Sequence, residues 1–121
     1  MEWKLDKDRP ICPQLCEKLC VMIANGDYKP DERLLSVRDV ALNAGVNPNT
    51  VQKSFEQLER QDLIYSVRGS GWYVKGNVEL AKKAVQELVD EKTKEYFMQM
   101  QNLGFDEAKT KEIIERWNKN E

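Results

Sequence analysis

The stretch SVRDVALNAGVNPNTVQKSF, residues 36–55, constrains the fold of this chain more than any other part, because it holds two helix starts in close succession. Ser36 stands three residues before Asp39, so its hydroxyl can cap the free backbone amides of one helix, while the Asp39 carboxylate can accept a hydrogen bond from the Ser36 amide. Asn47 is a favourable N-cap for the next helix, and Pro48 fits its first position, where a missing amide donor costs nothing. The stretch therefore predicts two short helices.

Gly45 lies between these two helices and supplies a tight turn. A two-turn helix, a glycine turn and a second helix that opens with short polar side chains form the layout of a helix-turn-helix, whose second helix enters the major groove of DNA. Apolar residues at helical spacing on both helices are expected to face a core. They are Val37, Val40 and Ala41 on the first helix and Val51, Phe55 and Leu58 on the second. DNA binding is the leading functional hypothesis.

The outward side of the second helix carries Asn49, Gln52 and Lys53. Asn and Gln can pair bidentately with adenine, and Lys can donate to guanine or to a phosphate. A purely structural surface helix could use any good helix former here, so the composition favours base reading without requiring it. Arg38, near the start of the preceding helix, is also turned outward and free to meet a phosphate or a base.

Two short β-branched and aromatic segments follow, LIYSV at residues 63–67 and WYV at residues 72–74, and they predict a β-hairpin. Its tip is RGSG, residues 68–71, where glycines permit positive φ and close approach of the backbone to a phosphate. Alone, such a tip is more often only a turn. After a helix-turn-helix it is expected to be the wing of a winged helix, with Arg68 directed at phosphate or the minor groove.

Residues 11–25 have the spacing of an amphipathic helix, and residues 27–35 have a turn signal and no sustained period, which predicts a connecting loop. Cys12, Cys16 and Cys20 stand four apart along the helix. We interpret them as small buried hydrophobic residues on its inner side. A metal or redox role is the alternative, although the chain has no histidine to complete a mixed metal site.

The C-terminal part predicts a long helix over residues 77–103, a break at Gly104 and a short final helix. The final helix has an apolar side formed by Ile113, Ile114 and Trp117. Two helices without a core of their own cannot bury these apolar stripes, so they must pack on the winged helix, on a second copy of the chain, or on both. We expect a homodimer, with a DNA-binding domain at residues 1–75 and a dimerisation region at residues 76–121.

Composition excludes several classes of protein. The 121 residues are 40% hydrophobic and 33% charged, as is ordinary for a soluble globular protein, and no apolar run approaches the length of a membrane span. No signal segment is visible, so a cytoplasmic location is the expectation. Histidine, metal-ligand spacing, a phosphate-cradling loop and a nucleophile beside a base are all lacking, so we expect neither an enzyme nor a bound cofactor or metal. An effector site is not visible either.

The net charge of −2 argues against DNA binding through bulk charge alone. Residues 1–75 hold 11 basic and 11 acidic side chains, whereas residues 76–121 hold 8 and 10. The excess acidity lies away from the helix-turn-helix, so the position of basic residues must matter more than their number. A near-neutral winged helix also suits a protein-protein interaction module, and that function is the alternative to DNA binding.

Residues 10–74 resemble the GntR-type bacterial transcription regulators without a gap, in the segments PICPQL, KPDERLLSVRDVA, GVNPNTVQKSFEQLE and LIYSVRGSGWYV. Leu35 stands where the family usually has Pro, Cys12 where Tyr is common, and Asp62 where Gly usually precedes the wing strand. Lys53 replaces a frequent Arg, which keeps the charge but loses the bidentate fork. The resemblance implies a mainly α fold with a small β-hairpin, in which a winged helix-turn-helix DNA-binding domain is followed by a C-terminal helical hairpin.

The resemblance also implies which residues contact DNA. Carried over position by position, they are Ser36, Arg38, Pro48, Asn49, Thr50, Gln52 and Lys53 in the helix-turn-helix, and Arg68 and Gly69 in the wing. Asn49 and Gln52 are expected to read base edges, whereas the two arginines supply orientation and affinity. Thr50 and Lys53 are expected at the DNA backbone or a base, and Ser36 contributes through its cap or a phosphate contact.

The short C-terminal part resembles the YtrA subfamily, whose members carry about two C-terminal helices for dimerisation in place of a large effector-binding domain. This implies a homodimer that binds a palindromic operator in double-stranded DNA, with half-sites about one helical turn apart, ~10 base pairs or a little more. Such a transcription regulator is expected to be a repressor.

Overall fold

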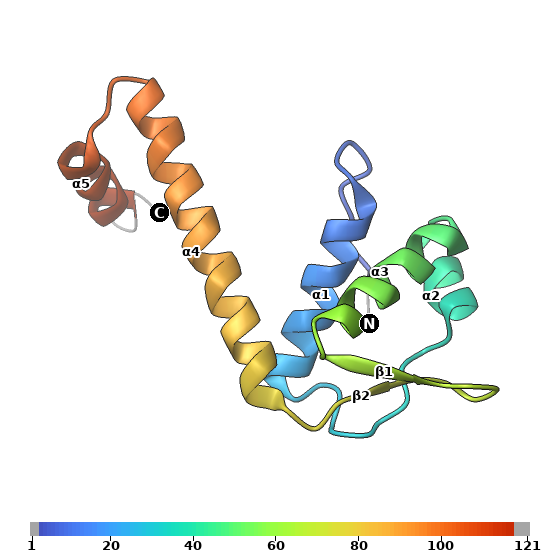
Figure 1. The fold of residues 1–121 in the computed structure, drawn as a ribbon. Coiled ribbons are helices and arrows are strands. Elements are labelled where there is room, and N and C mark those ends of the chain that lie inside the picture. The colour runs from blue at the N-terminus through green and yellow to red at the C-terminus, as the bar shows by residue number, and fades with distance from the viewer. Residues whose placement is uncertain (1–2, 118–121) are drawn as a thin grey trace. The chain divides into compact units, whose positions relative to one another are not determined.

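The computed structural model of the chain describes residues 3–117 (Figure 1). Within them the elements follow in the order α1 (Ile11–Asn25), α2 (Val37–Ala44), α3 (Pro48–Arg60), β1 (Ile64–Val67), β2 (Gly71–Val74), α4 (Val78–Asn102) and α5 (Glu107–Trp117). The prediction of a mainly helical fold with one antiparallel hairpin is confirmed. The chain divides into two compact units, and the boundary falls after Val85, inside α4.

The core of the first unit forms where α3 packs against α1 on one side and α2 on the other (Figure 1). Its largest side chains come from the helical stripes that the sequence shows. Leu15, Leu19 and Ile23 of α1 and Val51, Phe55 and Leu58 of α3 are each no more than 1% exposed. Burying such a side chain contributes roughly 1.5–3 kcal/mol, so the contact between α1 and α3 contributes substantially to the stability of this unit.

Both helices of the helix-turn-helix begin at the residues that the sequence indicates. The Ser36 hydroxyl accepts a hydrogen bond from the Asp39 amide at 3.0 Å, and the Asn47 side chain accepts one from the Asn49 amide at 2.8 Å. Gly45 ends α2 in the left-handed conformation, with φ of 68°. These local bonds satisfy amides that a helix start leaves free, and they fix where α3 begins.

The hairpin pairs β1 with β2 in antiparallel register, with Tyr65 opposite Tyr73. The segment before α2, predicted to be a loop, pairs with the far edge of β2. The Leu34 amide donates to the Trp72 carbonyl at 2.8 Å, and the Val74 amide donates to the Glu32 carbonyl at 3.0 Å. Residues 31–34 therefore act as a third strand-like edge, which covers the backbone groups that β2 would otherwise leave unpaired.

The second unit contains the rest of α4 and α5. Gly104 follows α4 with φ of 90°, and the Asp106 carboxylate caps α5 by accepting a hydrogen bond from the Lys109 amide at 2.9 Å. Its exposed large apolar side chains are Val89, Tyr96, Met98, Leu103, Phe105, Ile114 and Trp117. None of the helices described here is both long and apolar enough to pass through a lipid bilayer.

Candidate nucleic-acid interface

Helix α3, the second helix of the helix-turn-helix, has a buried side and a solvent-facing side. Val51 and Phe55 are completely buried, and so is Ser54, whose hydroxyl bonds back to the Thr50 carbonyl at 2.9 Å. The solvent-facing side presents Asn49, Gln52 and Lys53, all exposed. The expected burial of the apolar stripe is confirmed. The solvent-facing side presents amide and ammonium groups, while the opposite side of the helix packs into the core.

The other residues of the helix-turn-helix that are expected at DNA lie at the N-terminal caps or in the first turns of α2 and α3. Ser36, Arg38 and Pro48 are exposed, whereas Thr50 is half-buried in the first turn of α3. Two of these positions sit at helix N-termini, where free amides and the helix dipole favour a phosphate. Ser36 already engages the Asp39 amide through its hydroxyl, so a DNA contact there would share that group.

The wing turn, residues 68–70, carries Arg68 and Gly69 on the surface. Gly69 has φ of 78°, and a Cβ built at this position would meet nothing within 4 Å. The constraint at Gly69 is therefore backbone conformation and not space. The Ser70 amide donates to the Val67 carbonyl at 2.9 Å and closes the turn.

Glu59 ties the wing strand to the recognition helix. Its carboxylate accepts hydrogen bonds from the Ser66 amide at 3.3 Å and from the Ser66 hydroxyl at 3.1 Å. On the core side, the rings of Phe55 and Trp72 meet edge to face with centroids 5.6 Å apart. The helix and the hairpin are thus joined by polar and aromatic contacts, so residues on α3 and in the wing keep a defined relation.

Two residues that position this surface were missed from the sequence. The Lys7 ammonium donates to the Gly45 carbonyl at 2.8 Å and to the Ala44 carbonyl at 3.4 Å, which satisfies the C-terminal end of α2. The Arg33 guanidinium donates to the Ser70 carbonyl in the wing turn. Both contacts join parts of the chain that are far apart in sequence, and no local pattern marks either residue.

The cysteine stripe faces the interior. Cys16 and Cys20 are buried and Cys12 is half-buried, and all three are free thiols. Burial, with Cys12 alongside, raises the pKa of the Cys16 thiol to about 12, and burial also raises the pKa of Cys20. This agrees with their interpretation as small buried hydrophobic residues. Among the described residues no group of His, Cys, Asp or Glu side chains could hold a metal ion.

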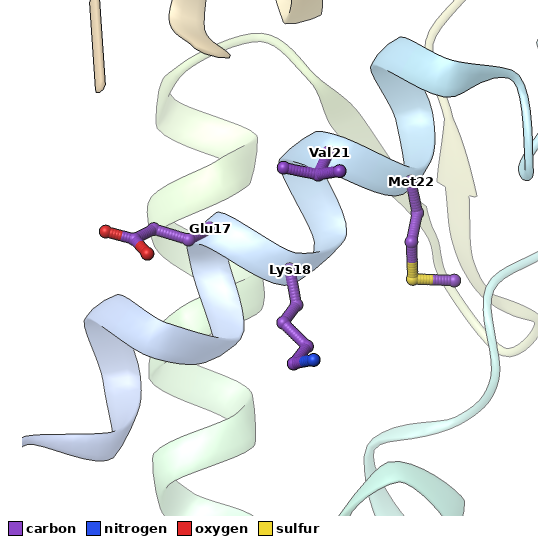
Figure 2. A pocket seen from close by; sticks show the side chains of 4 residues that line it. All are labelled: Glu17, Lys18, Val21 and Met22. Atoms are coloured by element: carbon purple, nitrogen blue, oxygen red, sulfur yellow. The ribbon is translucent and has the colours of Figure 1, made fainter. Parts of the chain in front are cut away.

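A hollow of about 400 Å³ lies on α1 and is lined by Glu17, Lys18, Val21 and Met22 (Figure 2). Lys18 and Met22 extend from the helix in one direction, and Glu17 extends in another (Figure 2). Small-molecule sites usually enclose the ligand and direct several polar groups at it. This hollow is open, and its two charged groups do not converge.

Comparison with known proteins identifies the unit that carries this surface. The sequence profile described as "Bacterial regulatory proteins, gntR family" matches residues 13–74. The chain belongs to the GntR family. The resemblance inferred from residues 10–74 is confirmed, and the family consists of transcription regulators, not enzymes.

Two proteins of Bacillus subtilis (strain 168) are among its relatives. The uncharacterized HTH-type transcriptional regulator YhcF is 27% identical over 104 residues, which cover 86% of each protein. The HTH-type transcriptional repressor YtrA is 38% identical over 68 residues, which cover 56% of this chain and 52% of YtrA. The chain therefore matches YhcF over most of its length but only about half of YtrA.

Solved structures show the same fold. A GntR family transcriptional regulator from Listeria monocytogenes superposes with a TM-score of 0.79 at 28% identity, covering 93% of this chain and 98% of that one. The DNA-binding domain of AraR, in complex with the operator ORE1, superposes with a TM-score of 0.53 at 28% identity, covering 61% of this chain and 93% of that one. The second comparison supports a winged helix-turn-helix in the first unit.

Proposed function

We propose that this transcription regulator is a repressor that binds a palindromic operator in double-stranded DNA as a homodimer. The observation that carries the proposal is the solvent-facing side of α3, where Asn49, Gln52 and Lys53 stand exposed while the opposite side is locked into the core. The side-chain amides of Asn and Gln each offer a donor and an acceptor that complement the acceptor and the donor of adenine in the major groove. A regulator of this kind would act in the cytoplasm, where bacterial DNA lies.

Within this proposal the contacts divide into three groups. Asn49 and Gln52 read base edges, and the charged side chains of Arg38, Lys53 and Arg68 meet phosphates or bases. The remaining contacts come from Ser36, Pro48, Thr50 and Gly69, which bring backbone or short side chains close to the DNA. The AraR domain is described in complex with an operator, which supports operator binding. YtrA is described as a repressor, which supports a role in repression.

The dimerisation region proposed is residues 76–121. The helical hairpin that forms the second unit exposes several large apolar side chains. A hollow of about 180 Å³ on this hairpin is lined by Tyr96, Ile113, Ile114 and Trp117. Large apolar side chains that stay exposed on a pair of helices favour burial against another protein surface. A second copy of the same region supplies a matching apolar surface, as a two-fold interface requires.

In vitro selection from random DNA duplexes tests the proposal. The selected duplex should bind the wild-type chain, and Arg38→Ala and Gln52→Ala should each weaken that binding. Lys29→Ala serves as the control, because Lys29 is an exposed cation in the loop after α1, outside both the proposed DNA contacts and the proposed dimerisation region. Unchanged affinity in both test variants would contradict the assignment of the surface.

Salt dependence separates DNA binding from the alternative of a protein-binding winged helix. Counterion release makes the affinity of a DNA-binding protein fall steeply with added salt, whereas a protein-protein interface is much less affected. The wild-type chain should show the steep dependence with its selected duplex. Failure to enrich any duplex in the selection would favour the protein-binding module instead.

A further inference from the structure

Arg33 links the segment before α2 to the turn of the wing. Its backbone lies opposite Tyr73 of β2 in an isolated antiparallel bridge, directly before the bond between the Leu34 amide and the Trp72 carbonyl at 2.8 Å. From this place the guanidinium reaches the wing turn and donates to the Ser70 carbonyl. The turn therefore receives a hydrogen bond from outside the hairpin.

The same guanidinium occupies the space beside Gly71. A Cβ built on Gly71 would lie 3.2 Å from Nε and 3.4 Å from Nη2 of Arg33, and Gly71 has φ of 138°. Glycine at this position thus allows both the backbone conformation and the close approach of Arg33. Gly69, two residues earlier, also has positive φ, so glycines with this conformation lie within the turn and directly after it, at the start of β2.

A second set of contacts restrains the turn through the side chain of Ser70 and not through its carbonyl group. The Ser70 hydroxyl hydrogen-bonds with the Tyr73 hydroxyl, and Tyr73 stacks on Tyr65 with ring centroids 5.6 Å apart. The Tyr65 hydroxyl donates to the Asp31 carboxylate at 2.9 Å. Segment 31–33 therefore contacts the hairpin through backbone bonds to Val74 and through the side chains of Asp31 and Arg33. Among these contacts, the Arg33 guanidinium is the one that reaches the backbone of the turn.

We propose that Arg33 is a positioning residue for DNA binding, which fixes the Ser70 carbonyl and thereby the direction in which Arg68 and Gly69 meet the DNA. The inference rests on the proposed function, because it assigns Arg33 a role through those two wing residues. A turn already held in its binding conformation loses less conformational freedom on binding than a mobile one. Arg33 acts through the free protein's structure and needs no contact with DNA itself.

A double-mutant cycle tests the role against a direct phosphate contact. Arg33→Ala should weaken binding of the selected duplex about fivefold or more, and Arg68→Ala should weaken it too. In the Arg68→Ala background, Arg33→Ala should weaken binding less than it does in the wild-type background, because only the Gly69 contact then depends on Arg33, and it should leave the salt slope unchanged. Additive losses of affinity, with a further decrease in salt slope, would show that Arg33 binds phosphate directly and would overturn the proposal.

Backbone order parameters of the free protein provide a readout that does not involve DNA. In Arg33→Ala, the amides of Ser70 and Gly71 should lose order on the picosecond to nanosecond timescale, toward values below about 0.6, while amides of α1 and α3 stay rigid. Unchanged order in the turn would also overturn the proposal. If the wild-type chain enriches no duplex, the proposed function fails and the DNA role of Arg33 with it, whereas additivity in the cycle removes the role of Arg33 alone.

Discussion

Asp62 adopts a backbone conformation that usually belongs to glycine. It follows α3 with φ of 66°, its amide donates to the Glu59 carbonyl at 3.0 Å, and the Leu63 amide donates to the Leu58 carbonyl at 3.1 Å. This pair of bonds is the Schellman motif, whose left-handed residue is most often Gly. The chain has instead a carboxylate there, which pairs with Lys75.

The first prediction compares Asp62→Gly with Asp62→Ala. Both variants lose the exposed ion pair, worth roughly 0–1 kcal/mol, so their difference isolates the backbone term. Asp62→Gly should be more stable than Asp62→Ala by about 1 kcal/mol, because a Cβ opposes the left-handed conformation. Urea unfolding of the two variants measures this difference. Equal midpoints and slopes would show that the left-handed conformation carries no cost here.

The second prediction concerns the buried thiol of Cys16. Its pKa is raised by burial to about 12, whereas an unfolded thiol titrates near roughly 8.5. The contribution of the neutral thiol to stability is therefore complete below the unfolded pKa. It falls as pH rises from there through about 12, because the unfolded state loses its proton first. Unfolding free energies at pH 8, 9.5 and 11 should decline more steeply in the wild type than in Cys16→Ala, and parallel declines would contradict the assignment.

At the scale of elements, the parts predicted correctly are those whose signals are local. The caps Ser36 and Asn47 fixed the starts of α2 and α3, and the predicted first helix, residues 11–25, matches α1. A cap or an apolar stripe acts within a few residues, so it can be read without knowing the fold. The helix-turn-helix could therefore be predicted almost completely.

The long-range hydrogen bonds that position the proposed DNA-binding surface could not be predicted from local sequence patterns. Arg33 and Ser70 are 37 residues apart, as are Lys7 and Ala44, and each basic side chain reaches a backbone carbonyl. A carbonyl is present at every residue, so sequence provides no complementary partner to search for. The pairing of residues 31–34 with β2 was missed because Pro30 and the charged residues after it have the composition of a turn.

The third prediction separates base reading from phosphate contact on α3. Gln52→Ala should weaken the selected duplex by about 1–3 kcal/mol but leave a scrambled duplex nearly unaffected, because a bidentate base contact carries sequence information. Lys53→Ala should weaken both duplexes alike and reduce the salt slope by about 1 if its ammonium meets a phosphate. Titrations at several salt concentrations, with Lys29→Ala as control, measure both effects. Equal losses on both duplexes for Gln52→Ala would remove its role in base reading.

For the whole molecule, the distribution of charge and of apolar surface supports specific binding by two copies over general attraction by one. The net charge of the chain is −2, so a single winged helix has little electrostatic excess with which to hold DNA. Two recognition helices on one molecule of DNA can compensate, because the second binds at high effective concentration once the first is in place. The proposed dimer therefore predicts an operator with half-sites about one helical turn apart, roughly 10 base pairs.

The last prediction tests that arrangement through Ile114, which is 44% exposed on α5 and lines the hollow of the hairpin. Wild-type protein should sediment as a dimer at micromolar concentration, and Ile114→Asp as a monomer, because the new carboxylate would have to be buried without a partner. Ala108→Asp is the matched control: it adds the same charge at an exposed position in the first turn of α5, where the helix dipole tolerates it.

Binding to DNA provides the second measurement. Wild type and the Ala108→Asp control should prefer a duplex with two half-sites over a single half-site by about 100-fold or more, and Ile114→Asp should lose that preference while still binding a half-site weakly. A wild-type monomer under these conditions would contradict dimerisation, whereas an Ile114→Asp dimer would place the interface elsewhere.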